Sequence, residues 1–176
     1  MEVSIRAWKR EDAAALAELL NDERILNNLR DGLPYPYTKR DAEEYIDSVF
    51  QADKETTFAF AITAGGSLAG SIGVFRCGNI HFRTAEMGYY LGQAYWGKGI
   101  GTEAVRQTCR YVFEHTDILR IFAEPFACNL ASCRVLEKAG FQYEGTLRSN
   151  AVKNGRVLDM KLYALVREEP ERGADR

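Results

Sequence analysis

The sequence predicts a single α+β domain with a mixed, mostly antiparallel sheet and helices on both faces. Three consecutive strand patterns joined by short turns predict an antiparallel meander, which is followed by a helix, a strand and a second helix. The chain has 176 residues, 46% apolar and 11% aromatic, which is enough to fill one core. It shows neither an internal repeat nor a linker. We therefore expect one domain over residues 1–166, and a charged tail at 167–176 that frays.

One strand and two helices are expected before the meander. Residues 3–8 alternate as in a half-buried strand, and residues 10–20 carry apolar side chains at helical spacing. Residues 31–37 form a loop, because two prolines and a glycine exclude a regular element. Thr38 and Asp41 then match a capping box that opens a helix to about residue 51. The expected inward positions are Ala14, Leu16, Ala17, Leu19 and Leu20 in the first helix, and Ala42, Tyr45, Ile46, Val49 and Phe50 in the second.

The meander and the elements after it follow from turn signals and periodicity. Strands are expected at 57–63 and 68–75, joined through Gly65-Gly66, and at 85–91 after a loop around Gly78-Asn79. Gly140 ends the last helix, and Asn154-Gly155 separates the last two strands. The later elements are a helix at 101–115, a strand at 119–123, a helix at 129–139, and strands at 141–146 and 157–166. The inward residues of these helices are Ala104, Val105, Cys109, Val112, Phe113, Ala131, Val135, Leu136 and Ala139.

Composition narrows the classes of partner. A formal charge of −2 and a pI near 5.8 give no overall basic field, so we expect no general nucleic-acid binding. The sequence has neither an apolar run long enough for a membrane span nor a signal-peptide core at its start, which favours a cytoplasmic protein. The four cysteines lack CxxC spacing and are expected to be free thiols. A zinc site at Cys128 and Cys133 is disfavoured, because only His81 and His115 remain as nitrogen ligands.

Residues 92–104, GQAYWGKGIGTEA, match two phosphate-binding patterns in part. Gly92, Gly97 and Lys98 begin a P-loop, but Gly99 stands where that motif needs a hydroxyl for magnesium. The spacing Gly99-x-Gly101-x-x-Ala resembles a dinucleotide fingerprint, with an acidic residue about twenty positions on. Both folds usually open with their phosphate turn, whereas this turn follows a meander. Both interpretations are therefore disfavoured, and a plain linking turn is the remaining alternative.

The order of elements and three motifs, YWGKGIGTEA, NLASCRVLEKAGF and YEGTLR, resemble the GNAT superfamily of N-acetyltransferases and, within it, the Rim-type branch. That branch includes enzymes that acetylate the N-termini of ribosomal proteins. The resemblance runs from about residue 3 to residue 166, so it covers the expected domain. It implies acetyl-coenzyme A as co-substrate, no metal, and a sheet splayed between its fourth and fifth strands where the coenzyme enters. Whether two copies of the chain form a homodimer is left open.

The resemblance places the pyrophosphate of coenzyme A on the glycine turn. Backbone amides at a helix N-terminus bind such an anion through hydrogen bonds and the helix dipole. Trp96 departs from the family pattern, which has a polar residue there, but the backbone amides are unaffected. Asn129 resembles the side chain that holds a pantetheine amide, and a helix N-cap is its alternative role. The implied coenzyme-binding residues are the strand backbone at Tyr89, Tyr90 and Leu91, the turn residues Gly97, Lys98, Gly99, Ile100, Gly101 and Thr102, and Asn129.

Acetyl transfer to an amine needs a neutral nucleophile and a proton for the departing thiolate. Glu86 and Glu124 each resemble a position that serves as general base in the superfamily, and ordinary ion pairing is the alternative for both. Leu136 stands where many members have a tyrosine acid, so Ser132 is the candidate that assists the thiolate. Direct attack on the thioester needs no acetyl-cysteine, and we expect direct transfer.

The acceptor is expected to be an α-amino group of a peptide or protein. An α-amine titrates near pH 7.7–8.0 and a lysine near 10.4, so the α-amine is more easily presented in neutral form. The loop at 31–37 stands where related enzymes build the acceptor wall, and its aromatics and acid suit a peptide end. The alternatives are a small-molecule amine such as a polyamine or antibiotic, and a non-catalytic module that only binds acetyl-coenzyme A.

Overall fold

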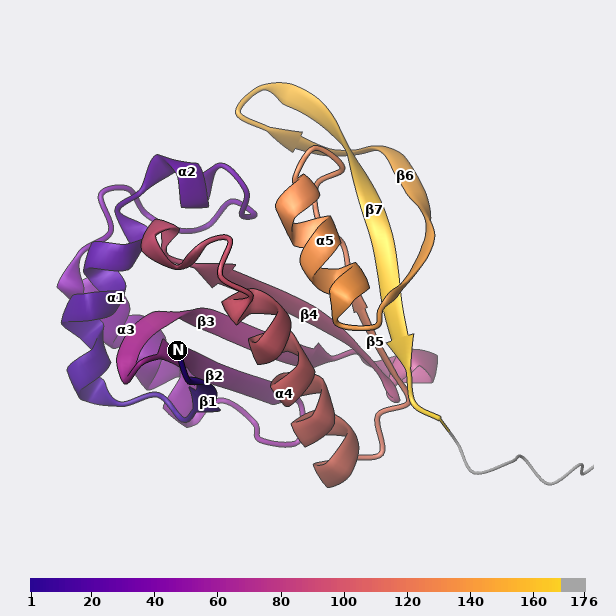
Figure 1. Cartoon of the computed structure of the whole chain (residues 1–176), viewed down its shortest axis with the longest axis horizontal. Coiled ribbons are helices and arrows are strands. Elements are labelled where there is room, and N and C mark those ends of the chain that lie inside the picture. The colour runs from indigo at the N-terminus through magenta and orange to yellow at the C-terminus, as the bar shows by residue number, and fades with distance from the viewer. Residues whose placement is uncertain (169–176) are drawn as a thin grey trace, which may run out of the picture.

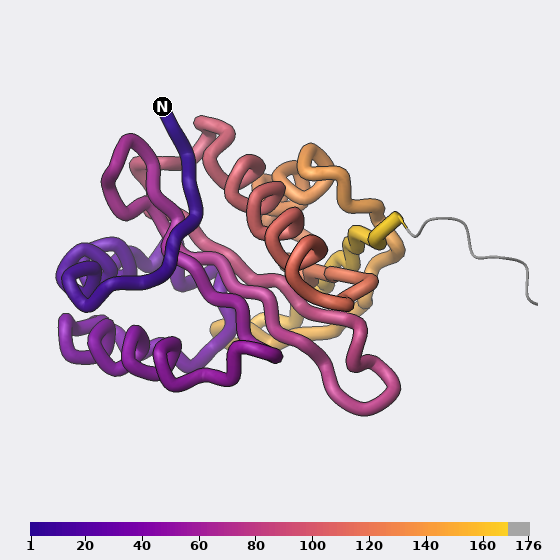
Figure 2. Tube along the Cα trace, turned by 90° about the horizontal axis from the view of Figure 1, so that it is seen from below, coloured from indigo at the N-terminus to yellow at the C-terminus, as the bar shows by residue number. Residues whose placement is uncertain are grey.

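A seven-stranded sheet runs through the molecule, with helices packed on both of its faces (Figures 1 and 2). A computed structural model describes residues 1–168, so the expected tail lies outside the described residues from position 169 onward. The elements are β1 (Val3–Arg6), α1 (Ala13–Leu20), α2 (Glu23–Leu26), α3 (Lys39–Gln51), β2 (Thr57–Ala64), β3 (Ser67–Arg76), β4 (Thr84–Leu91), α4 (Ile100–His115), β5 (Arg120–Ala123), α5 (Leu130–Lys138), β6 (Gln142–Lys153) and β7 (Arg156–Val166).

The strands lie in the order β1-β2-β3-β4-β5-β7-β6. Every neighbouring pair is antiparallel except β4 and β5, which are parallel and joined through α4. The mixed, mostly antiparallel sheet and the meander predicted from the sequence are therefore confirmed.

The parallel pair forms only a short seam. Residues 84–86 of β4 are in register with residues 120–122 of β5, and the pairing ends there. The rest of β4, residues 87–91, pairs with β3 on one side and has no strand partner on the other among residues 1–168. Figure 1 shows β5 diverging from β4 beyond this seam. The sheet is thus splayed between its fourth and fifth strands, as the family resemblance implies.

The local signals that predicted caps and turns act as expected. Asp41 N donates to Thr38 Oγ1 at 3.2 Å, and Thr38 N donates to Asp41 Oδ2 at 2.7 Å, which completes the capping box of α3. Gly65 and Gly66 turn the β2–β3 hairpin at φ +58° and +83°, a region that L side chains rarely adopt.

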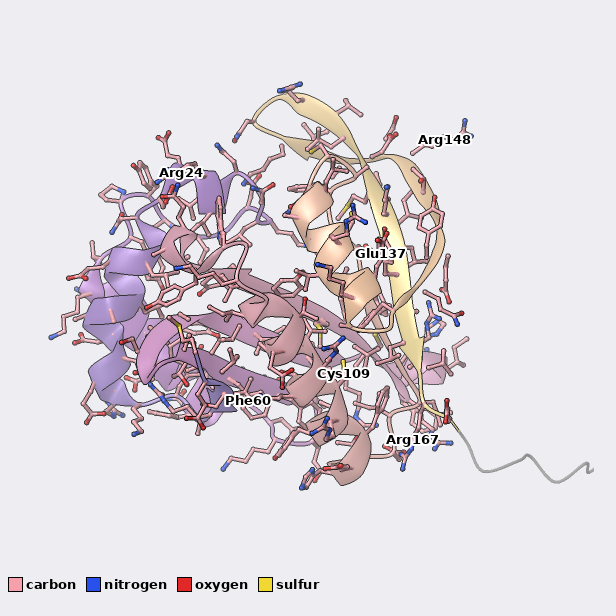
Figure 3. The ribbon with its side chains drawn as sticks, in the orientation of Figure 1. Arg24, Phe60, Cys109, Glu137, Arg148 and Arg167 are labelled. Atoms are coloured by element: carbon pink, nitrogen blue, oxygen red, sulfur yellow. The ribbon has the colours of Figure 1, made fainter. Side chains whose placement is uncertain are left out.

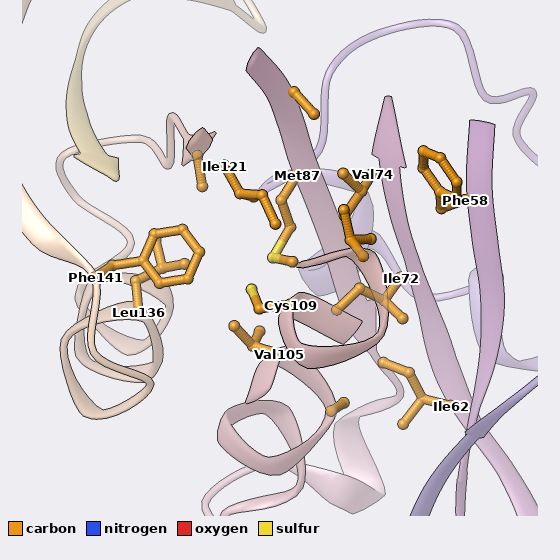
Figure 4. Packing of buried hydrophobic residues seen from close by; sticks show 14 of the residues in the cluster. Phe58, Ile62, Ile72, Val74, Met87, Val105, Cys109, Ile121, Leu136 and Phe141 are labelled. Carbon is orange, nitrogen blue, oxygen red and sulfur yellow. The ribbon is translucent and has the colours of Figure 1, made fainter. Parts of the chain in front are cut away.

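Two apolar cores pack on opposite faces of the sheet. One fills the space between β1–β4 and the helices α1 and α3, and includes Trp8, Leu16, Leu20, Ile46 and Ala61. The other lies under α4 and α5 and joins both halves of the sheet. Figure 4 shows its centre, where side chains from β2, β3, β4, α4, β5 and α5 meet, among them Ile72, Val74, Met87, Val105, Ile121 and Leu136.

Three expected inward positions are wrong. A short 3₁₀ turn at Arg10–Asp12 precedes α1, so its buried stripe includes Ala13 and leaves Ala14 exposed. Ala131 is exposed because the inward face of α5 is centred on Cys133 and Leu136. Phe50, at the end of α3, is 42% exposed, and the guanidinium of Arg10 lies over its ring at 5.7 Å.

Some element boundaries also differ from the prediction. The first strand ends at Arg6 and not at residue 8, because Trp8 turns into the core beside α3. Helix α2 was not predicted; Asp22 caps it by accepting from Arg24 N at 2.9 Å. Strand β6 continues to Lys153 past residue 146, across a bulge at residues 148–150. Asp159 on β7 holds this bulge by accepting from Ser149 N at 2.7 Å.

Candidate active site

The glycine turn before α4 is shaped to bind an anion. Gly97 and Gly99 have φ +71° and +76°, and no atom lies within 4 Å of the place that a Cβ would take at either. Gly99 is the N-cap and supplies no capping side chain, so the first amides of α4, at Ile100, Gly101 and Thr102, have no acceptor among the described residues. A pyrophosphate fits this requirement, because each of its oxygens can accept from such an amide.

The other turn residues have structural contacts. A Cβ at Gly101 would lie 3.4 Å from Leu91 Cδ1 and 3.5 Å from Val135 Cγ2. These are ordinary van der Waals distances, so this face of Gly101 lies against the packing of α4 with β4 and α5, and its role in coenzyme binding stays a prediction. Lys98 Nζ donates to Ala94 O at 2.7 Å, and the Trp96 indole donates to Leu91 O at 2.9 Å.

Alternation along β4 sends Tyr89 and Tyr90 to opposite faces of the sheet. Tyr90 packs against the core of α1 and α3, and burial raises its pKa well above the ordinary value. Tyr89 belongs to the core of α4 and α5, and its hydroxyl lies 2.9 Å from Ser132 Oγ. The backbone of both tyrosines lies beyond the seam, where β4 has no strand partner on the β5 side. Their proposed pairing with a pantetheine arm stays a prediction.

The first turn of α5 positions Ser132. Asn129 caps the helix by accepting from Ser132 N at 3.2 Å, so its capping role is confirmed, and its contact with pantetheine stays a prediction. Tyr163 donates to Glu137 Oε1 at 3.0 Å and holds α5 against β7. Glu137 is labelled on α5 in Figure 3. Leu136, where many members of the family have a tyrosine, is fully buried in the core.

Glu86 and Glu124, which lie far apart in sequence, meet at one guanidinium. Arg30, in the connection between α2 and α3, donates to Glu86 and lies 3.8 Å from Glu124 Oε2. Burial raises the pKa of Glu124, and the neighbouring negative charge of Glu86 adds to this, while Arg30 opposes it. Raised carboxyl pKa values beside a like charge are frequent at catalytic sites. The two predicted general bases are therefore brought together, although their catalytic role stays a prediction.

A cleft of about 280 Å³ opens beside these carboxylates. Its walls come from the α2–α3 connection, the segment after β5, and the β6–β7 hairpin. Two contacts hold the hairpin to the connection: Lys153 Nζ lies 2.7 Å from Asp31 Oδ1, and Asn154 donates to Asn27 Oδ1 at 2.9 Å. The lining includes Arg30, Asp31, Glu124, Asn150, Lys153 and Met160.

Sequence reasoning missed Arg30 and Lys153. Each is a single cation in a polar stretch and carries no periodic or motif signal. A larger cleft of about 760 Å³ lies near the end of α4, lined by Arg76, His115 and Asp117 among others, and it contains none of the predicted site residues.

Within residues 1–168, no group of three or more His, Cys, Asp or Glu side chains is placed to hold a metal ion. None of the helices described is long and apolar enough to cross a membrane.

Comparison with known proteins gives relatives along most of the chain. A Bacillus subtilis (strain 168) protein named "Probable N-acetyltransferase YjcK" is 38% identical over 121 residues, which are 69% of this chain and 67% of the relative. The ribosomal protein uS5-alanine N-acetyltransferase of Escherichia coli (strain K12) is 33% identical over 97 residues, 53% of this chain and 50% of that protein.

Solved structures share the fold. RimL, a ribosomal L7/L12 alpha-N-protein acetyltransferase in complex with coenzyme A, superposes with a TM-score of 0.83 at 21% identity, covering 93% of both chains. A spermidine N-acetyltransferase from Vibrio cholerae, with coenzyme A and spermine, superposes with a TM-score of 0.77 at 23% identity, covering 93% of this chain and 95% of that one. The family model described as the acetyltransferase (GNAT) domain matches residues 2–142. The chain therefore belongs to the GNAT acetyltransferase family.

Proposed function

We propose that this acetyl-coenzyme A-dependent N-acetyltransferase modifies the α-amino group of a peptide or protein, with a ribosomal protein as one such acceptor. The observation that carries the proposal is the meeting of Glu86 and Glu124 at Arg30, with Arg30 and Glu124 in the lining of the cleft. Acetyl-coenzyme A supplies an acetyl group activated as a thioester. The chain's own residues bind it, orient the amine, and move protons.

Two groups handle the protons in this proposal. A carboxylate of the pair accepts the proton that the amine loses, and its raised pKa makes Glu124 a stronger base than an ordinary glutamate. Ser132 donates a hydrogen bond to the departing sulfur, and Tyr89 orients the serine hydroxyl. The turn amides from Gly97 to Thr102 hold the pyrophosphate, while Asn129 and the backbone of Tyr90 and Leu91 hold the pantetheine arm.

The free-energy cost of deprotonating the amine supports an α-amine as the acceptor. An α-amine has a pKa of 7.7–8.0 and a lysine side chain one of 10.4, so neutral lysine at pH 7 costs about 3 kcal/mol more. Neither histidine lines the cleft that Glu124 lines, so carboxylates are the bases at hand, and they favour the less basic amine. The Escherichia coli relative, named for acetylating an alanine of a ribosomal protein, agrees with this choice.

A small-molecule amine is the second candidate. Two carboxylates beside one cleft also attract a cationic amine, and the spermidine acetyltransferase shares the fold. A binding module without catalysis is disfavoured, because Glu86, Glu124 and Ser132 are all present at or near the splayed strands.

Competition among acceptors tests the proposal. Release of coenzyme A is measured at pH 7 with a free-N-terminus peptide, its N-blocked lysine-containing counterpart, and a set of polyamines and aminoglycosides. We expect release chiefly with the free N-terminus. Acetylation confined to the polyamines or aminoglycosides would overturn the proposal of a peptide acceptor. If no amine caused release of coenzyme A, catalysis of acetyl transfer by this protein would be contradicted.

A further inference from the structure

We infer that Arg30 limits the cleft lined by Glu124 to acceptors whose only positive charge is that of the reacting amine itself. The inference rests on the proposed function, because it assigns this cleft to the acceptor. It adds a residue that determines specificity and a charge rule that separates monoamines from polyamines.

The charged side chains around the cleft carry a small net negative charge. Among the described residues, its lining carries Arg30, Asp31, Glu124 and Lys153, and Arg30 is paired with Glu86 behind it. Three carboxylates thus face two cations, and the set carries one net negative charge. One monocationic acceptor neutralises it. Arg148, in the β6 bulge, does not line the cleft and points away from α2 (Figure 3).

The carboxylates of this set differ in how closely each is paired with a cation. Lys153 Nζ lies 2.7 Å from Asp31 Oδ1, with the lysine side chain 12% exposed and that of Asp31 79% exposed, so the charge of Asp31 is offset by a direct partner. Arg30 donates to Glu86 directly but is 3.8 Å from Glu124, beyond hydrogen-bonding distance. Glu124 is therefore the carboxylate that lacks a full partner, and it lines the cleft.

Arg30 is more exposed than the two glutamates it contacts. The side chain of Arg30 is 63% exposed, whereas those of Glu86 and Glu124 are 29% and 24% exposed. Arg30 accordingly lies at the mouth, and the carboxylates lie deeper. An acceptor that places its ammonium at Glu124 passes close to the guanidinium, and a second ammonium a few bonds away meets that charge. Specificity then comes from repulsion as much as from attraction.

A matched pair of amines tests the rule. Dissociation constants of butylamine and 1,4-diaminobutane are measured by NMR titration at low salt on the protein without acetyl-coenzyme A. Arg30→Gln should shift the ratio of the two constants toward the diamine by about fivefold, the upper end for partly exposed charge pairs. Arg30→Lys keeps the charge and should keep the wild-type ratio. Arg40→Gln removes a similar cation on α3, which pairs with Glu44 away from the cleft, and should change nothing.

The outcomes separate the inference from the proposed function. An unchanged ratio in Arg30→Gln, or the same shift in Arg30→Lys or Arg40→Gln, would overturn the role of Arg30. Coenzyme A release with the same amines and with a free-N-terminus peptide is measured in parallel. Turnover with an unshifted ratio would overturn only the charge rule, whereas a shifted ratio with no turnover for any acceptor would overturn the proposed function.

Discussion

The hydroxyl of Tyr89 on β4 lies 2.9 Å from the hydroxyl of Ser132 in the first turn of α5. The contact bridges the gap that opens where β4 and β5 diverge. Burial raises the pKa of Tyr89 to about 12, so its proton stays on the phenol at physiological pH and is available to a hydrogen bond. Ser132 is thus held from both sides, through its amide by Asn129 and through its hydroxyl by Tyr89.

Ser132→Ala should lower kcat by about 10–100-fold, the low end of general acid–base effects, while the dissociation constant of acetyl-coenzyme A stays within about twofold. The helix cap survives because the donor to Asn129 is a backbone amide. Steady-state kinetics with a binding titration checks this. Full activity in the variant would leave Ser132 as an ordinary helix residue.

Tyr89→Phe keeps the buried ring and removes only the hydroxyl. Loss of the neutral hydrogen bonding to Ser132 Oγ and Ser132 O predicts a fall in kcat of roughly 2–10-fold. If the tyrosine acts through Ser132, Tyr89→Phe should have no further effect in the Ser132→Ala background. A double-mutant cycle on kcat decides the matter, since independent, multiplicative losses would contradict this link.

Gly99→Glu should abolish the rise in melting temperature that acetyl-coenzyme A produces, because a side chain and a negative charge then stand at the phosphate turn. Gly66→Glu is the matched control. Both glycines have similar positive φ and open space around the missing Cβ, so both variants should lose a similar stability of about 1–2 kcal/mol without ligand. If acetyl-coenzyme A still raised the melting temperature of Gly99→Glu, the assignment of this turn to the pyrophosphate would be contradicted. An equal rise of the wild-type melting temperature with NAD or ATP would contradict the specificity for acetyl-coenzyme A.

Glu124→Gln should raise the melting temperature at pH 7. Folding raises the pKa of this carboxyl, chiefly through burial, so the charged form opposes folding at every pH above both the ordinary and the raised value. The gain should disappear as pH falls below the ordinary value, where the carboxyl is protonated in both states.

Glu144→Gln provides the opposite case. Its hydrogen bonds from Arg120, at 2.8 and 2.5 Å, hold the pKa of Glu144 below its ordinary value. The charged form therefore supports folding above the ordinary pKa, and the variant should melt lower at pH 7 and approach the wild type as pH falls through the lowered pKa. Thermal melts at pH 7 and pH 3 compare the two variants; the same sign in both would contradict the assigned environments.

Leu136→Tyr, which restores the residue found in many members of the family, should not rescue Ser132→Ala. The leucine is fully buried, so a larger polar ring overpacks the core at a cost of about 1–3 kcal/mol. Chemical denaturation with the activity assay checks both expectations. Recovered activity would show that the tyrosine reaches the sulfur from this position.

The parts of the fold predicted from the sequence are those set by neighbours in the chain. The capping box of Thr38 and Asp41 acts over three residues, and the hairpin at Gly65-Gly66 depends only on positive φ. The error at Ala14 also has a local cause, because the short 3₁₀ turn before α1 shifted the helical stripe.

The parts that were missed depend on distant partners. Arg30 reaches Glu86 across 56 positions, and Lys153 reaches Asp31 across 122, so neither has a local pattern. The continuation of β6 past residue 146 depends on Asp159 in the opposite strand. Both glutamates were found only because their positions resemble those of the family, and the cation that joins them had no such precedent.

The divergence of β4 and β5 also bears on aggregation. A strand with unpaired backbone groups can recruit a strand from another molecule when it lies at the border of a sheet. Here the borders are β1 and β6, and the unpaired length of β4 is recessed within the sheet, where Leu91 lies beside both α4 and α5. Under the proposed function, the pantetheine arm occupies this recess. The recess keeps the unpaired backbone of β4 away from the borders of the sheet, where strands of other molecules pair most readily.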